Sequence, residues 1–230
     1  TGTIGDIGTS SFYPPHHMTM GEGGAVYTKN AVLHNILRSM RDWGRDCRCP
    51  SGVDNICQHR FDGQYGELPR GYDHKYVGYN LKVTDLQASI GCAQLEKFPQ
   101  FVERRKENFQ RLRAALSPAA DKLILPEPCE NADPSWFGFL LTCREGVSRE
   151  KLVRFIEQKG VQTRMLFAGN LTKHPCFDEL RESGEGYRIV GELRETDRIM
   201  RDTFWVGVYP GMTPEMIDYM ASVILEGLNQ

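Results

Sequence analysis

The segment 10–24, SSFYPPHHMTMGEGG, combines two adjacent histidines with two prolines and a glycine-rich turn. Its composition suits neither a helix nor a regular strand, and irregular, restricted backbone often positions chemical groups. His16 carries an imidazole whose ordinary pKa is about 6.5, which suits it to general-base catalysis. We therefore expect a site of proton transfer here, against the alternative that His16 is a polar loop residue.

Cys47, Cys49 and Cys57 form a second group, with the spacing C-x-C-x7-C in DCRCPSGVDNICQHRF. Thiolates bind both zinc and iron-sulfur centres, so the spacing alone leaves zinc, a cluster and no metal open. Seven cysteines form an odd set without the regular spacing of a disulfide framework. The other four lie among apolar or helical residues, and we expect them to be small buried thiols: Cys92, Cys129, Cys143 and Cys176.

The elements that must position these groups begin with a short strand at 23–30 and a helix at 31–43, which has apolar residues at helical spacing. A loop at 44–79 follows and holds the three cysteines. Loops of that length are usually functional or mobile. Thr84 then opens a helix whose apolar pattern runs to Phe98, with a break expected at Pro99 before a long helical arm.

Beyond Pro118 the pattern changes to alternating strands and helices. It predicts strands at 135–143 and 161–167, a capped helix at 148–160, and a final helix at 213–228 with Pro214 in its first turn. The second region is therefore expected to be a compact α/β domain.

Composition is that of an ordinary globular protein, with 230 residues and 40% hydrophobic residues. The net charge of -2 and the absence of a basic cluster in the sequence lead us to expect no nucleic-acid partner. No stretch approaches the roughly 18 consecutive apolar residues of a membrane helix. We expect a soluble cytoplasmic protein without membrane association, and a chain that begins in the middle of a domain.

Two segments resemble signatures of the aminotransferases that act on nucleotide-linked keto-sugars, the DegT/DnrJ/EryC1/StrS family. SSFYPPHHMTMGEGG resembles the cofactor-lysine motif, with His16 at the position of the lysine and Ser11 at that of the phosphate-binding serine. GYNLKVTDLQASIGCAQLEKF resembles the second signature, in which an asparagine, here Asn80, reaches the cofactor phosphate of the neighbouring subunit. The family pattern has a few more residues between Lys75 and Gly78, so this loop is shorter or residues are absent from the sequence.

The resemblance covers essentially all 230 residues and implies an α/β fold, that of the fold-type I pyridoxal phosphate enzymes. Residues 1–98 would be the C-terminal part of the cofactor-binding large domain with the cysteine-rich loop. Residues 99–230 would be the interdomain helix and the small C-terminal α/β domain. A homodimer with shared active sites is implied as well.

The histidine at the lysine position implies a changed reaction. Lysine links covalently to the cofactor aldehyde and also shuttles protons, whereas imidazole only moves protons. The resemblance therefore implies pyridoxamine phosphate held noncovalently, with His16 as the base that removes a proton from the cofactor. Expulsion of a sugar hydroxyl follows, which gives dehydration and not amination.

A member of this histidine-bearing group has the same cysteine spacing and a 2Fe-2S cluster. The resemblance thus implies that Cys47, Cys49 and Cys57 ligate such a cluster, with a fourth cysteine upstream of Thr1 or, as a weaker alternative, His59. A flavin- and iron-sulfur-containing, NADH-dependent reductase would supply the electrons. A related dehydrase that lacks the cluster is the alternative.

The implied activity is C3 deoxygenation of a nucleotide-linked 4-keto-6-deoxyhexose. CDP-4-keto-6-deoxyglucose is the leading substrate, for the 3,6-dideoxyhexoses of lipopolysaccharide O-antigens, and a TDP-linked sugar is its rival. A non-catalytic sugar-binding or regulatory member of the family is the alternative from another class. Resemblance and side-chain chemistry place Arg164, Asn170 and His174 as substrate contacts, although each also suits a solvated loop.

Overall fold

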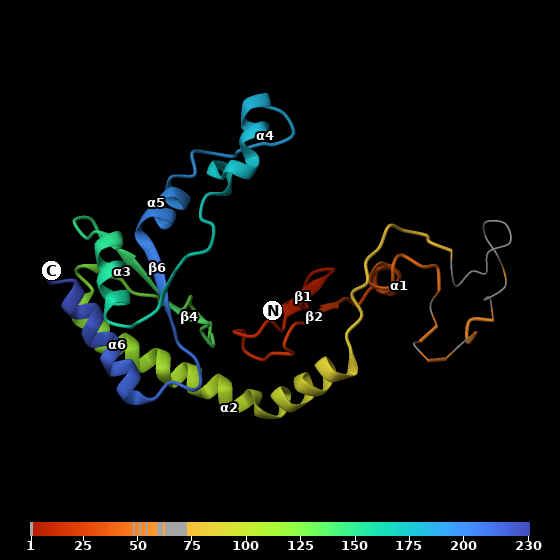
Figure 1. Ribbon diagram of the computed structural model, residues 1–230, viewed down its shortest axis with the longest axis horizontal. Helices are drawn as coiled ribbons and strands as arrows, with labels where there is room; N and C mark the ends of the chain where they lie inside the picture. Colours follow the sequence, from red (N-terminus) through yellow and green to blue (C-terminus); the bar gives the residue numbers. More distant parts are fainter. Residues whose placement is uncertain (1, 48, 51, 54, 59–61, 63–72) are drawn as a thin grey trace. The chain divides into compact units, whose positions relative to one another are not determined.

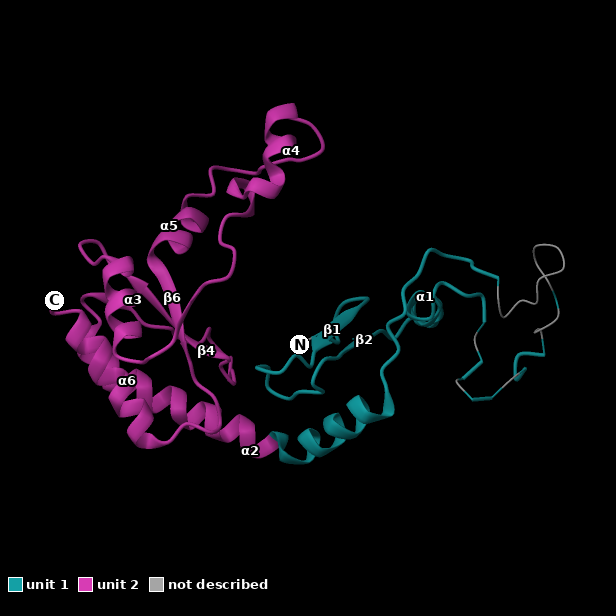
Figure 2. Ribbon diagram, in the orientation of Figure 1, with its two compact units in different colours: residues 1–98 teal, residues 99–230 magenta. Residues whose placement is uncertain are grey.

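The structure is a computed structural model that describes residues 2–47, 49–50, 52–53, 55–58, 62 and 73–230. The chain divides into two compact units, Thr1–Phe98 and Pro99–Gln230 (Figure 2). One helix, α2 (Asp85–Leu116), labelled in Figure 1, crosses the boundary, and Figure 2 shows that it contributes residues to both units.

The first unit contains a β-hairpin of β1 (Gly8–Ser11) and β2 (Gly24–Tyr27). The strands are antiparallel, and Ser11 lies opposite Gly24. Helix α1 (Ala31–Arg41) follows at once, because the Asn30 side chain caps it by accepting from two backbone N–H groups. The predicted strand and helix are confirmed with shorter bounds, while β1 was not predicted.

Helix α2 continues through Pro99, so the predicted break there is wrong. Proline removes one helical hydrogen bond and normally kinks or ends a helix. On the C-terminal side, Phe109, Leu112 and Leu116 are 0–1% exposed in the core of the second unit. Burial of these side chains holds the helix and offsets the cost of one proline.

The second unit is built on a four-stranded antiparallel sheet in the order β3-β4-β6-β5. The strands are β3 (Leu123–Ile124), β4 (Gly138–Cys143), β5 (Thr163–Met165) and β6 (Thr203–Gly207). The predicted strands at 135–143 and 161–167 correspond to β4 and β5, whereas β3 and β6 were missed. Helices α3 (Arg149–Gln158) and α6 (Pro214–Gly227) confirm the two predicted helices.

One hydrophobic core joins the sheet to helices α2, α3 and α6. Alternate residues of β4 and β6 fill it, and their exposure is 0–1%: Phe139, Leu141, Phe204 and Val206. Every buried hydrophobic residue in the described part of the chain lies at Phe109 or beyond. In the first unit, by contrast, Val77 is 92% and Leu86 is 80% exposed. The described residues of the first unit therefore have no hydrophobic core of their own.

The prediction that the four cysteines outside the loop are buried holds for only one of them. Cys143 is a buried thiol as predicted, and desolvation raises its pKa to about 11. Cys92, Cys129 and Cys176 are exposed, so the prediction of burial was wrong for them. Cys92 follows the buried Gly91 on α2 but lies about a quarter turn further round the helix, on an exposed position. The other two lie outside the regular strands and long helices.

The connection between β5 and β6 carries short helical elements that the sequence reading did not predict. They are η3 (Leu171–Lys173), η4 (Pro175–Phe177), α4 (Asp178–Ser183) and α5 (Arg194–Asp202). None of the helices in the described ranges is long and apolar enough to span a membrane.

Candidate active site

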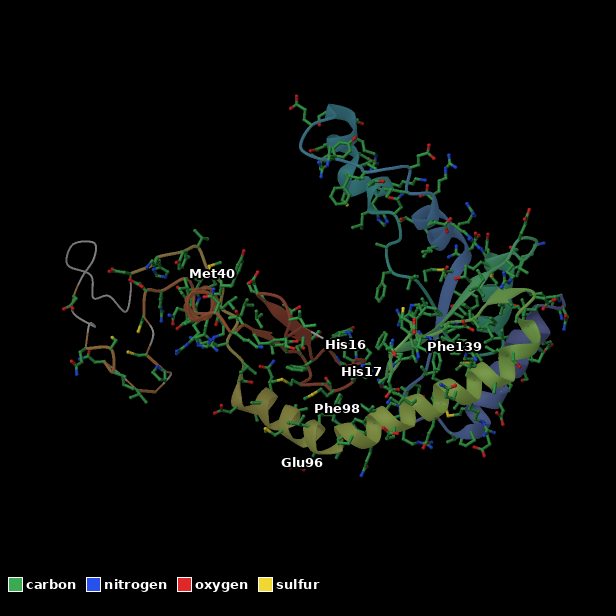
Figure 3. The ribbon with its side chains drawn as sticks, turned by 180° about the vertical axis from the view of Figure 1, so that it is seen from behind. His16, His17, Met40, Glu96, Phe98 and Phe139 are labelled. Carbon is green, nitrogen blue, oxygen red and sulfur yellow. The ribbon has the colours of Figure 1, made fainter. Side chains whose placement is uncertain are left out.

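His16 lies in the loop between β1 and β2, next to His17 (Figure 3). Its backbone N–H donates to the Tyr13 carbonyl across a turn that contains both prolines, whose rings restrict φ. The imidazole Nδ1 lies 3.3 Å from the Ser11 carbonyl oxygen, and the Tyr13 ring meets the imidazole edge-on at 5.6 Å. Because a carbonyl only accepts, this contact places the proton on Nδ1 and the basic lone pair of the neutral ring on Nε2.

The start of α2 fixes the other side of this loop. Gln87 Nε2 donates to the Glu22 carbonyl at 3.0 Å, and Gln94 Oε1 accepts from the Thr19 N–H at 3.4 Å. Between them, a Cβ on Gly91 would lie 3.0 Å from Met20 Cγ, so the Met20 side chain of the loop packs directly on the helix backbone. Residues 87, 91 and 94 share one helix face. Sequence reasoning missed them, although polar and small residues at helical spacing were the available signal.

We predict that Gly91→Val lowers the activity of the full-length protein by about 10- to 100-fold, because it displaces Met20 and with it the His16 loop, and misplacing a catalytic group by about 1 Å costs that much. Cys92→Val is the matched control, since it introduces the same β-branched residue at the exposed neighbouring position of α2. Steady-state kinetics and circular dichroism on both proteins provide the check. Equal activities for the two variants would show that contact with Gly91 does not position the loop.

Asn80 lies on an exposed segment that runs alongside the end of α1. It forms an isolated antiparallel bridge with Asp42, and the flanking N–H groups of Tyr79 and Leu81 donate to carbonyls of Met40 and Arg41. In the described residues no hydrogen bond joins Asn80 to the His16 loop. Asn80 is thus held firmly but on a different surface segment from Ser11 and His16.

The two ends of the cysteine-rich loop are joined at its base. Gly44 has a φ of +80°, and a Cβ there would come within 1.9 Å of the Tyr76 carbonyl oxygen. A Cβ on Gly78 would likewise lie 2.2 Å from the Gly44 nitrogen. Only glycine permits this approach of two backbones. The Lys82 ammonium lies 4.0 Å from the Trp43 ring centroid and 2.8 Å from an Asp42 carboxylate oxygen, which further fixes the base.

Cys47, Cys49 and Cys57 are partly exposed cysteines within this loop. Hydrogen bonds from the Cys57 backbone and thiol lower the pKa of Cys49, whereas burial raises the pKa of Cys47. The thiols therefore lie close enough to influence one another. Even so, no group of three metal-ligating side chains in the described residues is arranged to hold a metal ion. His59, the alternative ligand, lies outside the described residues.

The three predicted substrate residues occupy different environments in the second unit. Arg164 is exposed on β5, and the described residues offer it no hydrogen bond or ion pair. Asn170 is 3% exposed, caps η3, and donates to Asp197 at 2.7 Å. His174 Nε2 lies 2.6 Å from the Ala168 carbonyl oxygen. Asn170 and His174 thus bind the segment to itself, and Arg164 alone presents an unused charged group.

The chain belongs to the DegT/DnrJ/EryC1/StrS aminotransferase family, whose model matches residues 1–225. It is 55% identical over 236 residues to the lipopolysaccharide biosynthesis protein RfbH of Salmonella typhimurium, covering 99% of this chain and 53% of that protein. It is 51% identical to the dTDP-4-dehydro-2,6-dideoxy-D-glucose 3-dehydratase of Saccharopolyspora spinosa over 232 residues, covering 98% of this chain and 49% of the relative.

Similarity to solved structures supports the assignment to this family. The Escherichia coli GDP-4-keto-6-deoxy-D-mannose-3-dehydratase, with bound hydrated PLP, matches with a TM-score of 0.80 at 26% identity, over 97% of this chain and 55% of the other. The fold is thus the α/β fold of the pyridoxal phosphate-dependent enzymes of this family, as predicted. The chain spans about half the length of these relatives.

Proposed function

We propose that this chain supplies the proton-transfer half of a pyridoxamine phosphate-dependent nucleotide-sugar 3-dehydratase. The observation that carries the proposal is the imidazole of His16, held 3.3 Å from the Ser11 carbonyl in the loop where the family pattern has its cofactor lysine. The sequence between Ser11 and Gly24 contains no lysine. The enzyme therefore has a base at this point but no amine for a covalent cofactor link.

The residues present fit the cofactor. Ser11 is exposed at the end of β1, where its hydroxyl is available to donate to a phosphate oxygen. When bound, pyridoxamine phosphate supplies an amine that condenses with the sugar's keto group and a ring that accepts electrons. The first unit lacks a hydrophobic core among its described residues, which suits part of a larger cofactor-binding domain better than an independent one.

His16 acts as the base. With the Nδ1 proton directed to the Ser11 carbonyl, Nε2 takes a proton from the cofactor's methylene carbon and holds it. The turn through both prolines and the contacts with α2 keep this nitrogen in place. The proton held on Nε2 would then be available to the C3 hydroxyl of the sugar, which would leave as water.

The three loop cysteines are proposed to ligate a 2Fe-2S cluster, with a ligand upstream of Thr1. The spacing of the three cysteines within one loop and the closed base of that loop support this, because thiolates are the ligands of such clusters. Cys47, Cys49 and Cys57 would hold the cluster, which would supply single electrons received from a flavin- and iron-sulfur-containing, NADH-dependent reductase.

The proposed substrate is CDP-4-keto-6-deoxyglucose, and the pathway that of 3,6-dideoxyhexoses for lipopolysaccharide O-antigens. The 55% identity with a lipopolysaccharide biosynthesis protein supports it, and the 51% identity with a dTDP-sugar 3-dehydratase supports the dTDP-linked rival. Incubating the cofactor-loaded full-length protein and reductase with each nucleotide sugar is the test. We expect a 3-deoxy product, and a 4-amino sugar or the absence of any cofactor binding would refute the proposal.

A homodimer with shared active sites is also proposed, since Asn80 matches the family's asparagine that reaches the neighbouring subunit and is exposed, with no hydrogen bond to the His16 loop in the described residues. We predict that mixing full-length Asn80→Ala and His16→Asn proteins restores activity, up to about a quarter of wild type, because mixed dimers of a two-fold assembly have one intact site. Product formation after subunit exchange is measured, and each variant alone is the control. Persistent inactivity despite proven exchange would show that each site is built from one chain.

A further inference from the structure

The face of the sheet opposite the core in the second unit carries a row of side chains that the proton transfer does not use. Register places Arg164 opposite Trp205, and Trp205 opposite Leu140. Directly paired residues point to the same side of a sheet, so these three share one face, away from the buried Phe204 and Val206. Arg164 is exposed there with an unused guanidinium among the described residues.

Trp205 is fixed on this face. Its indole Nε1 donates to the Met165 carbonyl at 3.0 Å. A Cβ on Gly138 would lie 2.4 Å from the indole ring, so the ring packs directly on the glycine backbone of the neighbouring strand. Phe137 contacts the indole with a centroid distance of 5.2 Å. The ring is thus held in one orientation before any ligand arrives.

Phe167 extends the aromatic surface into solvent. Its side chain is 79% exposed, and its ring centroid lies 6.5 Å from that of Trp205 at an interplanar angle of 37°. The backbone φ is +50°, a conformation that is unfavourable for a bulky aromatic residue. An exposed aromatic residue gains no packing that would offset this strain, and such strain is characteristic of ligand-binding segments.

We propose that Phe167, Trp205 and Arg164 form a platform that binds the nucleoside diphosphate of the sugar substrate. The inference rests on the proposed function and adds the place where the nucleotide is held. A base stacks on the aromatic rings, and the Arg164 guanidinium pairs with the diphosphate, for which its planar fork of donors is suited. Because every base has a π face, the rings by themselves do not select one base over another.

Binding of CDP, dTDP and cytidine to the cofactor-loaded full-length protein, measured by calorimetry without turnover, tests the platform. We expect Phe167→Ala to weaken all three by about 10- to 100-fold, since stacking contributes to each. Arg164→Lys should weaken the two diphosphates by about 10-fold and leave cytidine unchanged, because only the bidentate contact is lost. Arg188→Gln, which removes another exposed arginine of the same unit, is the control and should change none.

Unchanged dissociation constants in Phe167→Ala would overturn the platform. A lowered melting temperature with unchanged binding would overturn it as well, because Phe167 would then have a structural role only. Repeating the titrations with His16→Asn separates this proposal from the proposed function. Normal nucleotide binding in His16→Asn together with loss in Phe167→Ala supports the platform whatever the role of His16. If Arg164→Lys weakens the binding of cytidine as much as that of CDP, the assigned contact of Arg164 with the diphosphate is wrong.

Discussion

Full-length protein in which His16 is replaced by asparagine is expected to bind pyridoxamine phosphate normally and to lose dehydration activity by about 100- to 10,000-fold, the usual contribution of a positioned general base. Asparagine can keep a hydrogen bond to the Ser11 carbonyl, so the loop and the phosphate contact remain. It cannot accept a proton at the position of Nε2. Rates of C3 oxygen loss and equilibrium binding of the cofactor, measured on the same preparations, give the two halves of the prediction.

His17→Asn is the matched control, because it removes an imidazole from the adjacent position of the same loop (Figure 3). We expect it to retain most of the activity, since the imidazole held against the Ser11 carbonyl is that of His16. Loss of activity in both variants to the same degree would indicate a general disturbance of the loop. Full activity in His16→Asn would remove His16 from the mechanism.

A second large effect is expected when Cys47, Cys49 or Cys57 is changed to serine in the full-length protein. Each change should remove the visible absorbance and the reduced-state paramagnetic signal of a 2Fe-2S cluster, because a cluster needs its full set of thiolates. Deoxygenation with an external reductase should be abolished. The dehydration half-reaction driven by His16 should remain, since the loop and the His16 hairpin are separate segments of the first unit.

Cys176→Ser is the control for the cysteine series, as it removes an exposed thiol that belongs to the second unit. Metal and sulfide analysis of anaerobically purified protein provides the sharper test. Iron and sulfide that disappear in Cys49→Ser and persist in Cys176→Ser would support the cluster. Stoichiometric zinc without iron would make the three cysteines a structural clip and would favour the dehydrase that lacks a cluster.

Local pattern predicted the helices and several strands correctly where hydrophobic periodicity is strong, as in α3 and α6. It failed where tertiary contacts decide. Pro99 signals a helix break locally, yet burial of residues ten or more positions later keeps α2 continuous. Strand β6 follows directly on α5, and its short run TFWVG becomes a central strand only because β4 and β5 pair on both sides.

In the candidate site, too, local motifs could be predicted from the sequence, whereas contacts between distant residues could not. His16 and Ser11 could be identified from a motif because they lie five residues apart and one turn brings them together. The contacts of Gln87, Gly91 and Gln94 with the loop join residues 65 to 75 positions apart, and no local pattern contains that pairing. Asn170 illustrates a further limit, since an amide that suits a sugar hydroxyl in a motif is used here to cap η3 and hold Asp197.

Exchange of the cofactor's methylene hydrogen with solvent deuterium tests most directly that His16 is the base. Full-length protein is loaded with pyridoxamine phosphate and the nucleotide-linked keto-sugar in deuterated buffer, and the released cofactor is analysed by mass spectrometry. We predict stereospecific uptake of deuterium in the wild-type protein and in His17→Asn, and none above background in His16→Asn. Exchange at the wild-type rate in His16→Asn would contradict the assignment of His16 as the proton-transferring residue.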